Sequence, residues 1–352
     1  MQTTPTNTPT SAPTRSILTI GNFDGVHAGH QSLLGAAEKM ATALGADRGV
    51  VVLSFDPHPL SVLCPSRTPT RLMSFASRTD LLLKAGATEV HRLSPTGELL
   101  GMSPEAFIAW VVEEFHPIGW IEGPDFRFGK NRAGTRETLQ NSAAGLPEHA
   151  RFEVKTVPPV AVALADNTVV TASSTIVRWL IERGRVRDVW SVLGRPYQLT
   201  GTVVPGDRRG RTLNFPTANL GPTTHNDQLE AVPMLPADGV YAALATMPDG
   251  SQRAAALSVG TKPQFQSDTQ TRTAEAFMLD IQAAPGTSNI PGLPEYGWPL
   301  QLDLVGWVRS QMKFDSVERL LEQMARDCQR VRQIIKHLTP TTPTNTPTST
   351  TA

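Results

Sequence analysis

Two histidines, His27 and His30, stand three residues apart in a glycine-rich segment that spans residues 21–30. The apolar, β-branched run before it, residues 16–20, predicts a buried strand, and the pattern of residues 31–40 predicts a helix after it. Glycine lets the backbone approach a ligand closely, and the free N–H groups of a helix start attract phosphate. Histidines there can donate to charge that develops on a phosphoryl group. The segment therefore favours nucleotidyl transfer from ATP over a surface turn with two polar histidines.

The length and charge of the chain limit the classes of protein to which it can belong. A chain of 352 residues has room for two domains, each with its own core. The 32 Lys and Arg residues balance 32 Asp and Glu residues, so the formal net charge is zero. We therefore expect no binding to nucleic acid or to a membrane surface. The basic cluster at residues 207–211 is too short to change this, and is either a solvated loop or a phosphate contact.

The two cysteines, Cys64 and Cys328, lie far apart in sequence and form neither a metal-binding spacing nor a disulfide framework. Cys328 is in step with the apolar stripe of a helical pattern, which predicts packing in a core. The sequence shows no stretch long enough to span a membrane and no pattern of a signal peptide. We therefore expect a soluble protein in the reducing environment of the cytoplasm.

Alternating strand and helix patterns over residues 15–185 predict a parallel sheet with helices on both faces. The expected strands are residues 16–20, 49–55, 89–93 and 118–122, and the expected helices are 31–40, 77–85 and 104–115, the last capped by Ser103. Ligands bind such sheets at the carboxyl ends of the strands, which is where the glycine-rich segment would lie.

Residues 186–338 show a different pattern, in which strand-like runs separated by turns precede one long helix. The expected strands are residues 198–204, 239–245, 254–259, 273–279 and 300–308, and the expected helix is 316–336. Asp315 is the expected N-cap of that helix, with Glu318 completing a capping box. This half therefore predicts a small antiparallel β-barrel closed by a C-terminal helix.

Low-complexity tails flank the two predicted domains. The Thr/Pro-rich residues 3–11 recur letter for letter at 341–349. Such tracts cannot bury apolar surface, so we expect residues 1–14 and 339–352 to be disordered and to lie outside the fold.

Four segments of the first half carry a resemblance to a known family. Residues 21–30 are followed by Ser-Phe-Asp-Pro-His-Pro at 54–59, by Gly-Pro-Asp-Phe-Arg-Phe-Gly at 123–129 and by Ser-Ser-Thr-Ile-Val-Arg at 173–178. Together they resemble the adenylyltransferase half of the bacterial bifunctional riboflavin kinase/FMN adenylyltransferases. The resemblance implies a Rossmann-like α/β nucleotidylyltransferase domain that joins FMN to the adenylyl group of ATP, giving FAD and pyrophosphate.

The resemblance also implies roles for individual residues of this half. His27 and His30 would act on the phosphates, Asp24 would position the substrates and Arg178 would hold the leaving pyrophosphate. The other nucleotide- and flavin-binding residues that it implies are Gly21, Asn22, Phe23, Gly29, Phe55, His58, Asp125, Phe128, Ser173, Ser174 and Thr175. Some relatives carry Asn where this chain carries Asp125.

The second half resembles the riboflavin kinases. Residues 214–219, Asn-Phe-Pro-Thr-Ala-Asn, resemble their PTAN motif, which implies a six-stranded barrel that phosphorylates riboflavin with ATP. Thr217 and Asn219 would work with Mg²⁺ and the ATP phosphates, since Mg²⁺ prefers oxygen ligands. Glu275, a single acid in an apolar strand, would be the general base for the riboflavin 5′-hydroxyl. The other nucleotide- or flavin-binding residues that the resemblance implies are Gly201, Gly206 and Arg309.

Departures from the family pattern leave two alternatives beside the main prediction. Asn214 replaces a usual Gly, Gln264 replaces a usual Thr, and residues 282–294 form a long Pro- and Gly-rich segment. One alternative is an adenylyltransferase with an impaired kinase half, and the other is a non-catalytic flavin-binding or regulatory protein. The presence of Glu275, Thr217 and Asn219 argues against the first. The presence of both His30 and Glu275 argues against the second. The main prediction is a bifunctional enzyme with ATP, riboflavin, FMN and FAD as its partners and Mg²⁺ as its metal.

Overall fold

The structure is a computed structural model that describes residues 14–206, 217–225, 228–262, 271–281 and 290–338. Asn214, Gln264, the Thr/Pro tails and most of the long segment that begins at residue 282 lie outside the described residues. The chain forms two compact units. The first comprises Met1–Arg178 and Ser191–Gly194, and the second comprises Trp179–Trp190 and Arg195–Ala352. Since the chain passes between the units more than once, the division into domains at residues 15–185 and 186–338 stays a prediction.

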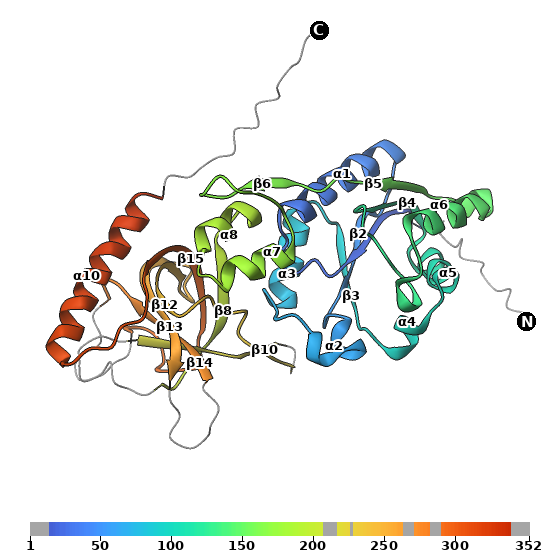
Figure 1. The fold of residues 1–352 in the computed structure, drawn as a ribbon. Helices are drawn as coiled ribbons and strands as arrows, with labels where there is room; N and C mark the ends of the chain where they lie inside the picture. The colour runs from blue at the N-terminus through green and yellow to red at the C-terminus, as the bar shows by residue number, and fades with distance from the viewer. Residues whose placement is uncertain (1–13, 207–216, 226–227, 263–270, 282–289, 339–352) are drawn as a thin grey trace, which may run out of the picture. The chain divides into compact units, whose positions relative to one another are not determined.

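The first unit contains a parallel sheet of five strands in the order β3-β2-β1-β4-β5 (Figure 1). Its strands are β1 Ser16–Gly21, β2 Gly49–Phe55, β3 Glu89–Leu93, β4 Pro117–Glu122 and β5 Glu153–Thr156. The α-helices of this part of the chain are α1 Ala28–Leu44, α2 Leu60–Leu63, α3 Phe75–Lys84, α4 Gly97–Gly101, α5 Pro104–Phe115 and α6 Arg136–Gly145. The hairpin of β6 Ala161–Ala163 and β7 Val169–Thr171 leads to α7 Ser174–Ile181 and α8 Val186–Leu193.

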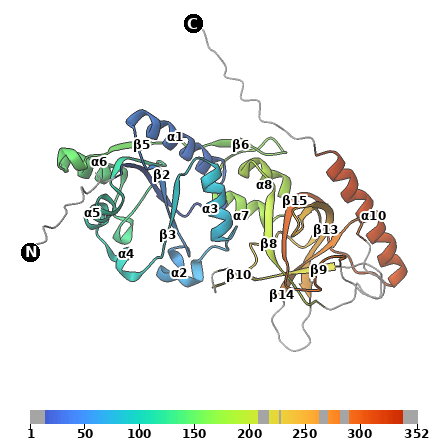
Figure 2. The same cartoon turned by 180° about the vertical axis from the view of Figure 1, so that it is seen from behind.

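Helices cover both faces of this sheet, as the alternating sequence pattern predicts (Figures 1 and 2). Side chains alternate along each strand, so Val50 and Val52 of β2 enter one core and Val51 and Leu53 the other. The first core contains residues of α1 and α3, and the second contains residues of α5 and α6. Ser103 caps α5 as predicted, because its Oγ accepts from the N–H of Ala106 at 3.2 Å.

The second unit contains a closed barrel of six strands in the order β12-β13-β14-β9-β8-β15. The barrel strands are β8 Tyr197–Val204, β9 Thr217–Gly221, β12 Gly239–Thr246, β13 Gln252–Lys262, β14 Thr271–Met278 and β15 Pro299–Arg309. Strand β10 Thr223–His225 pairs antiparallel with β11 Gln228–Glu230, and α10 runs over Val317–Lys336. Cys328, Val331 and Ile334 of α10 pack against the barrel, which confirms the predicted core position of Cys328.

The starts of three helices differ from the prediction, and the first of them is α3, which begins at Phe75 rather than at residue 77. Helix α1 begins at Ala28 rather than at residue 31, so Gly29 and His30 lie in its first turn and His27 is its N-cap. The predicted N-cap of the last helix, Asp315, is wrong. Ser316 has the extended backbone of a cap, and its Oγ accepts from the N–H of Arg319 at 3.3 Å, so Asp315 lies outside the helix. Asp315 forms an exposed ion pair with Arg319 instead.

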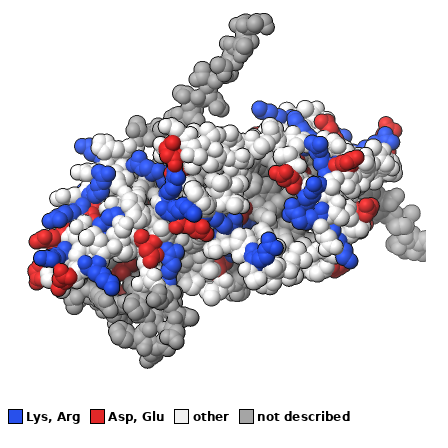
Figure 3. Space-filling model, in the orientation of Figure 1, with Lys and Arg blue, Asp and Glu red and all other residues white. Residues whose placement is uncertain are grey.

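On the face of the molecule drawn in Figure 3, acidic and basic side chains are interspersed, in keeping with the zero net charge. No helix in the described part of the chain combines the length and the apolar character that crossing a membrane requires.

The neighbouring leucines Leu82 and Leu83 of α3 test the packing of the first unit. Leu82 is 0% exposed in the core that contains residues of α1 and α3, whereas Leu83 is 43% exposed. Leu82→Ala should therefore lower the free energy of unfolding by about 2–5 kcal/mol, through lost burial and the cavity that remains. Leu83→Ala should change it by less than about 0.5 kcal/mol. Urea denaturation followed by circular dichroism measures both, and equal losses would contradict this packing.

Candidate active sites

The turn between β1 and α1 is held in a left-handed backbone conformation at three positions. The φ angles are +49° at Phe23, +90° at Gly25 and +42° at Val26. Left-handed backbone is uncommon for residues other than glycine, so surrounding structure must hold it. Phe23 and Val26 are buried in the core that α1 and the sheet share. The turn ends at His27, whose extended backbone starts α1.

The two histidines of this turn lie face to face. The ring centroids of His27 and His30 are 3.7 Å apart, and that of Phe23 lies 5.0 Å from that of His30. Gly29 makes the stacking possible, since a Cβ at this position would lie 3.1 Å from the His27 ring. Burial, and then the charges of His27 and Arg78, hold the pKa of His30 well below its usual range. The buried Nδ1 of His30 has no hydrogen-bond partner among the described residues, which leaves it available to a ligand.

Asp24 joins this turn to the Ser-Ser-Thr motif. Its buried carboxylate accepts from the N–H of Leu72 at 3.1 and 3.2 Å and forms an ion pair with Arg178. Its backbone carbonyl accepts from Ser174 Oγ at 2.6 Å. Arg178 also donates to the carbonyl of Thr70 at 2.7 Å. The structure thus brings Asp24, Ser174 and Arg178 together, three residues that the sequence predicts in one site.

The start of α7 carries the other two residues of the motif. Ser173 Oγ accepts from the N–H of Ile176 at 3.3 Å, so Ser173 acts as a helix cap. Thr175 is exposed. The motif therefore offers an exposed hydroxyl at the helix start and the Arg178 guanidinium one turn further on, an arrangement that suits phosphate.

The carboxyl ends of β1 and β4 separate beside the turn. Their ladder ends at the pair of Leu18 and Trp120, and beyond it the N–H of Ile20 donates to Glu122 Oε1 at 2.8 Å. The same oxygen accepts from the indole of Trp120 at 2.9 Å. Burial raises the pKa of Glu122 well above its usual range. This separation lies where the strand order reverses, which is the usual ligand position in such sheets.

The other predicted residues of this site differ in accessibility. Asn22 Oδ1 is buried and has no hydrogen-bond partner among the described residues, so it could accept from a ligand. The Nδ1 of His58 accepts from the N–H of Leu60 at 3.1 Å, and burial, followed by the charge of Arg178, lowers the pKa of His58. Asp125 is exposed. The Phe128 ring is buried in the core among aromatic side chains and anchors its turn there.

At two predicted positions, Gly21 and Phe55, the backbone rather than the side chain makes the contact that the structure shows. A Cβ at Gly21 would lie 3.2 Å from the ring of Phe23, so glycine gives that ring space. The backbone carbonyl of Phe55 accepts from Arg78 at 2.8 Å, and the Phe55 side chain is partly buried at the end of β2.

Three arginines that were not predicted from the sequence lie beside these residues. Arg71 and Arg92 form ion pairs with Asp56, which is 1% exposed, and Arg78 NH2 lies 3.6 Å from the same carboxylate. We call Arg71, Arg78 and Arg92 the arginine cluster. One of them left a signal in the sequence, because Arg78 stands four residues before buried Leu82 on the apolar face of α3.

In the second unit, the barrel brings the predicted kinase residues together. Thr217 Oγ1 donates to Glu275 Oε1 at 2.5 Å. Glu275 lies opposite Asn219 of β9 and opposite Ser258 of β13 in the strand register. A Cβ at Gly206 would lie 2.1 Å from Asn219 Nδ2, so the glycine backbone lies directly against this amide.

Gly201 has a structural role in the same barrel. A Cβ there would lie 2.4 Å from the carbonyl oxygen of Gly221 on β9, so only glycine allows β8 and β9 to approach this closely.

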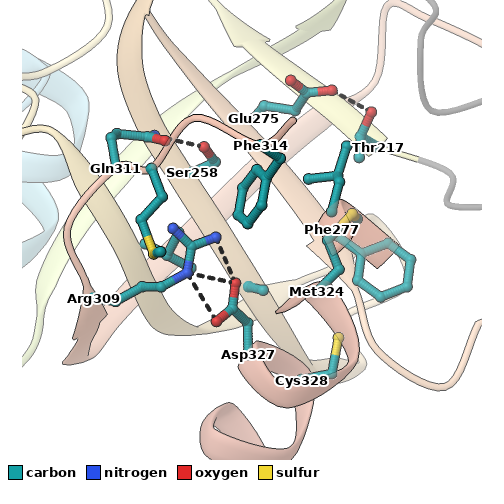
Figure 4. A pocket seen from close by; sticks show the side chains of 14 residues that line it. Thr217, Ser258, Glu275, Phe277, Arg309, Gln311, Phe314, Met324, Asp327 and Cys328 are labelled. Atoms are coloured by element: carbon teal, nitrogen blue, oxygen red, sulfur yellow. Dashed lines mark hydrogen bonds and ion pairs between the residues drawn. The ribbon is translucent and has the colours of Figure 1, made fainter. Parts of the chain in front are cut away.

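A cavity of about 280 Å³ lies between the barrel and α10 (Figure 4). Glu275 and Thr217 line one end, and the ion pair of Arg309 and Asp327 lines the other. The Nε of Arg309 donates to both carboxylate oxygens of Asp327, at 3.0 and 2.9 Å. The ring of Phe314 lies between the two ends in Figure 4, and other apolar lining comes from Phe277, Met324 and Cys328. An apolar cavity with polar groups at its ends suits a flat, amphipathic ligand.

Gln311 fixes the segment that follows β15. Its Nε2 donates to Ser258 Oγ at 3.0 Å and to the carbonyl of Val259 at 2.9 Å. This segment carries Phe314, so these bonds hold one wall of the cavity against β13.

The donors near Glu275 fit a hard cation. Within the described parts of the chain, no group of three or more His, Cys, Asp or Glu residues could hold a metal ion. Thr217 and Asn219 offer a hydroxyl and an amide oxygen beside the Glu275 carboxylate. Such a sparse set of oxygens suits Mg²⁺ that keeps waters and binds mainly through substrate phosphates.

Comparison with known proteins agrees with this two-unit arrangement. The family model of FAD synthetases matches residues 10–173, and that of riboflavin kinases matches residues 193–335. A relative from Listeria monocytogenes, named bifunctional riboflavin kinase/FMN adenylyltransferase, is 30% identical over 323 residues, which cover 92% of this chain and 93% of the relative. The relative of the same name from Bacillus subtilis is 28% identical over 325 residues, covering 92% and 94%.

A solved structure shares the fold over nearly the whole chain. It is described as a macrolide-efflux protein from Streptococcus pneumoniae, with a TM-score of 0.75, 28% identity, and coverage of 91% of this chain and 95% of that one. The fold, the two sites and the matches define a transferase with two units. The chain belongs to the bifunctional riboflavin kinase/FMN adenylyltransferase family, which confirms the resemblance found in its sequence.

The lowered pKa of His30 predicts a pH dependence of stability. Native His30 stays neutral, whereas an unfolded histidine takes up a proton near its usual pKa of about 6.5. Acidification below that pH therefore favours the unfolded chain, so stability should fall from pH 7.5 to pH 5.5. His30→Gln should reduce this fall, and the same change at exposed His149 should not. The denaturant midpoint at each pH measures this loss of stability. An equal loss in His30→Gln and in the unmodified protein would contradict the role given to His30.

Proposed function

We propose that this chain makes FMN from riboflavin and ATP in its second unit, and FAD from FMN and ATP in its first. The main support for this proposal is that the structure has two separate polar sites, one around Asp24 and one around Glu275. Asp24 and both histidines lie within the segment that matches the FAD synthetase model, which ends directly before Ser174, and Glu275 lies within the segment that matches the riboflavin kinase model. Both families use ATP, so ATP is the common substrate of the two reactions.

In the kinase reaction, Glu275 takes the proton of the riboflavin 5′-hydroxyl, and the resulting oxygen attacks the γ-phosphorus of ATP. The bond from that phosphorus to the β-phosphate oxygen breaks and ADP leaves. Thr217 and Asn219 hold the phosphates, and Mg²⁺, when bound with ATP, would neutralise charge there. The hydrogen bond from Thr217 Oγ1 orients the Glu275 carboxylate. The cavity beside Glu275, with Arg309 at its far end, holds the flavin.

In the adenylyl transfer, a phosphate oxygen of FMN attacks the α-phosphorus of ATP, and pyrophosphate leaves with the electrons of the broken P–O bond. No covalent enzyme intermediate is needed, so catalysis rests on alignment and charge stabilisation. His27 and His30 donate to the phosphates from the start of α1. Asp24 positions Arg178, which holds the leaving pyrophosphate. Gly21, Asn22, Ser174 and Thr175 contribute further phosphate or ribose contacts.

We place these reactions in the cytoplasm, since both cysteines are free thiols and the composition suits a reducing compartment. Nucleic acid and membranes are not among the partners that we propose.

Glu275→Gln should reduce riboflavin phosphorylation while leaving adenylyl transfer intact. Removing a general base lowers kcat by about 100- to 10,000-fold, and glutamine keeps the volume of the side chain. Flavin products resolved by chromatography would show little FMN from riboflavin but normal FAD from supplied FMN. Glu322→Gln, at an exposed acid of α10, is the matched control and should leave both activities unchanged. Loss of both activities in folded Glu275→Gln protein would contradict the division between the units.

His30→Ala should have the opposite effect. Losing one donor to the developing phosphate charge lowers the rate of FAD formation by about 100- to 1,000-fold. FMN should then accumulate from riboflavin, because Glu275 and its barrel are unaffected. His149→Ala serves as control, since His149 is exposed. Unchanged FAD formation in His30→Ala would remove this histidine from the proposed site.

A further inference from the structure

The arginine cluster gathers three guanidinium groups on one carboxylate. Arg71 precedes α3, Arg78 belongs to α3, and Arg92 lies near the end of β3. All three approach Asp56, which directly follows β2 and is 1% exposed. Arg92 also donates to the Asp56 carbonyl at 3.4 Å. Three chain segments thus converge above the carboxyl ends of β2 and β3.

The cluster is continuous with the Asp24 site. Arg78 NH2 lies 3.9 Å from Asp24 Oδ1, and Arg178 pairs with the other oxygen of Asp24. These contacts join six charged groups of the first unit. Four are guanidinium groups and two are carboxylates, so the net charge of the set is +2.

Burial distinguishes the roles of the three arginines. The side chain of Arg78 is 4% exposed and is held by Ser54 Oγ at 3.2 Å and by the Phe55 carbonyl at 2.8 Å. Those of Arg71 and Arg92 are 28% and 37% exposed. Arg78 is therefore the internal support of the set, while Arg71 and Arg92 reach its surface.

The reaction proposed for this unit requires two phosphate-bearing substrates in line. The attacking oxygen must approach the α-phosphorus from the side opposite the leaving pyrophosphate. Arg178 lies beside the β1 turn and is assigned to the pyrophosphate, whereas the arginine cluster lies over β2 and β3. Arg178 would thus face the leaving pyrophosphate, and the arginine cluster, linked to it through Asp24, would face the attacking phosphate.

We propose that Arg71 and Arg92 bind the phosphate monoester of the acceptor flavin, and that Arg78 positions them through Asp56. A guanidinium can bind phosphate with two parallel hydrogen bonds, and a phosphate monoester dianion balances the charge of the set. The buried Asp56 carboxylate holds the guanidinium groups in place before the substrate arrives. This inference rests on the proposed adenylyl transfer.

The test is steady-state kinetics of FAD formation by the full chain, with FMN and ATP varied in turn. Arg92→Gln should raise the KM for FMN by about tenfold or more, as expected for a lost charge-assisted hydrogen bond, with the KM for ATP unchanged. The KM for FMN of Arg92→Lys should lie between those of the unmodified protein and of Arg92→Gln, since lysine keeps the charge but not the planar guanidinium group. Arg71→Gln should behave like Arg92→Gln.

Arg48→Gln is the matched control. Arg48 also pairs with a carboxylate, Glu89 at 2.8 Å, and is 21% exposed, but it lies at the amino ends of β2 and β3. It should leave both KM values unchanged. Formation of FMN from riboflavin in the second unit should be normal in every variant, and circular dichroism spectra equal to that of the unmodified protein should show that the first unit is folded as well.

Three results would overturn the inference. An unchanged KM for FMN in Arg92→Gln would make the cluster purely structural. A raised KM for ATP, or for pyrophosphate in the reverse reaction, would assign the cluster to the nucleotide. A loss of FMN affinity equal in Arg48→Gln would show a general charge effect. If the unmodified protein forms no FAD in the same assay, the proposed function itself fails.

Discussion

The buried carboxylate of Asp24 is the constraint on which the first unit depends. A carboxylate on a side chain that is 8% exposed must be paired and hydrogen-bonded to be tolerated. Its partners come from separate parts of the chain: Leu72 before α3, Arg78 within α3 and Arg178 on α7. Satisfying this one group therefore places α3 and the start of α7 beside the turn that carries both histidines. The same group divides the cationic side chains into a set near Arg178 and a set near Asp56.

Strand register plays the corresponding part in the second unit. Glu275 is paired with Asn219 on one side and Ser258 on the other, so its carboxylate is presented beside Thr217. Because side chains alternate along a strand, a slip of one residue would turn Glu275 to the other face of the barrel. The barrel core prevents such a slip, because Ala274 and Ala276 on either side of Glu275 are buried. The position of the acid is thus a consequence of the packing of its neighbours.

The sequence predicted the longer elements because their apolar patterns are strong, whereas the short strands β5 and β9 were not predicted. The continuous apolar run of β2, which is buried on both faces, and the apolar stripe of α10 each follow from which side chains must be buried. The cap of α10 was misplaced because Asp315 and Ser316 are both good caps, and only the backbone of Ser316 decides between them. Side-chain contacts across the sheet were harder to predict. The arginine cluster joins residues from three segments, and their meeting at Asp56 depends on the strand order.

The most direct test of two separate catalytic sites is an assay of the unmodified chain with ATP and Mg²⁺, supplied with riboflavin in one reaction and FMN in another. Chromatography of the flavins follows the products over time. If each unit holds its own catalytic site, riboflavin should give FMN and then FAD, and FMN should give FAD alone. No product in either reaction would contradict this prediction, and FAD from FMN without FMN from riboflavin would contradict the role given to the barrel.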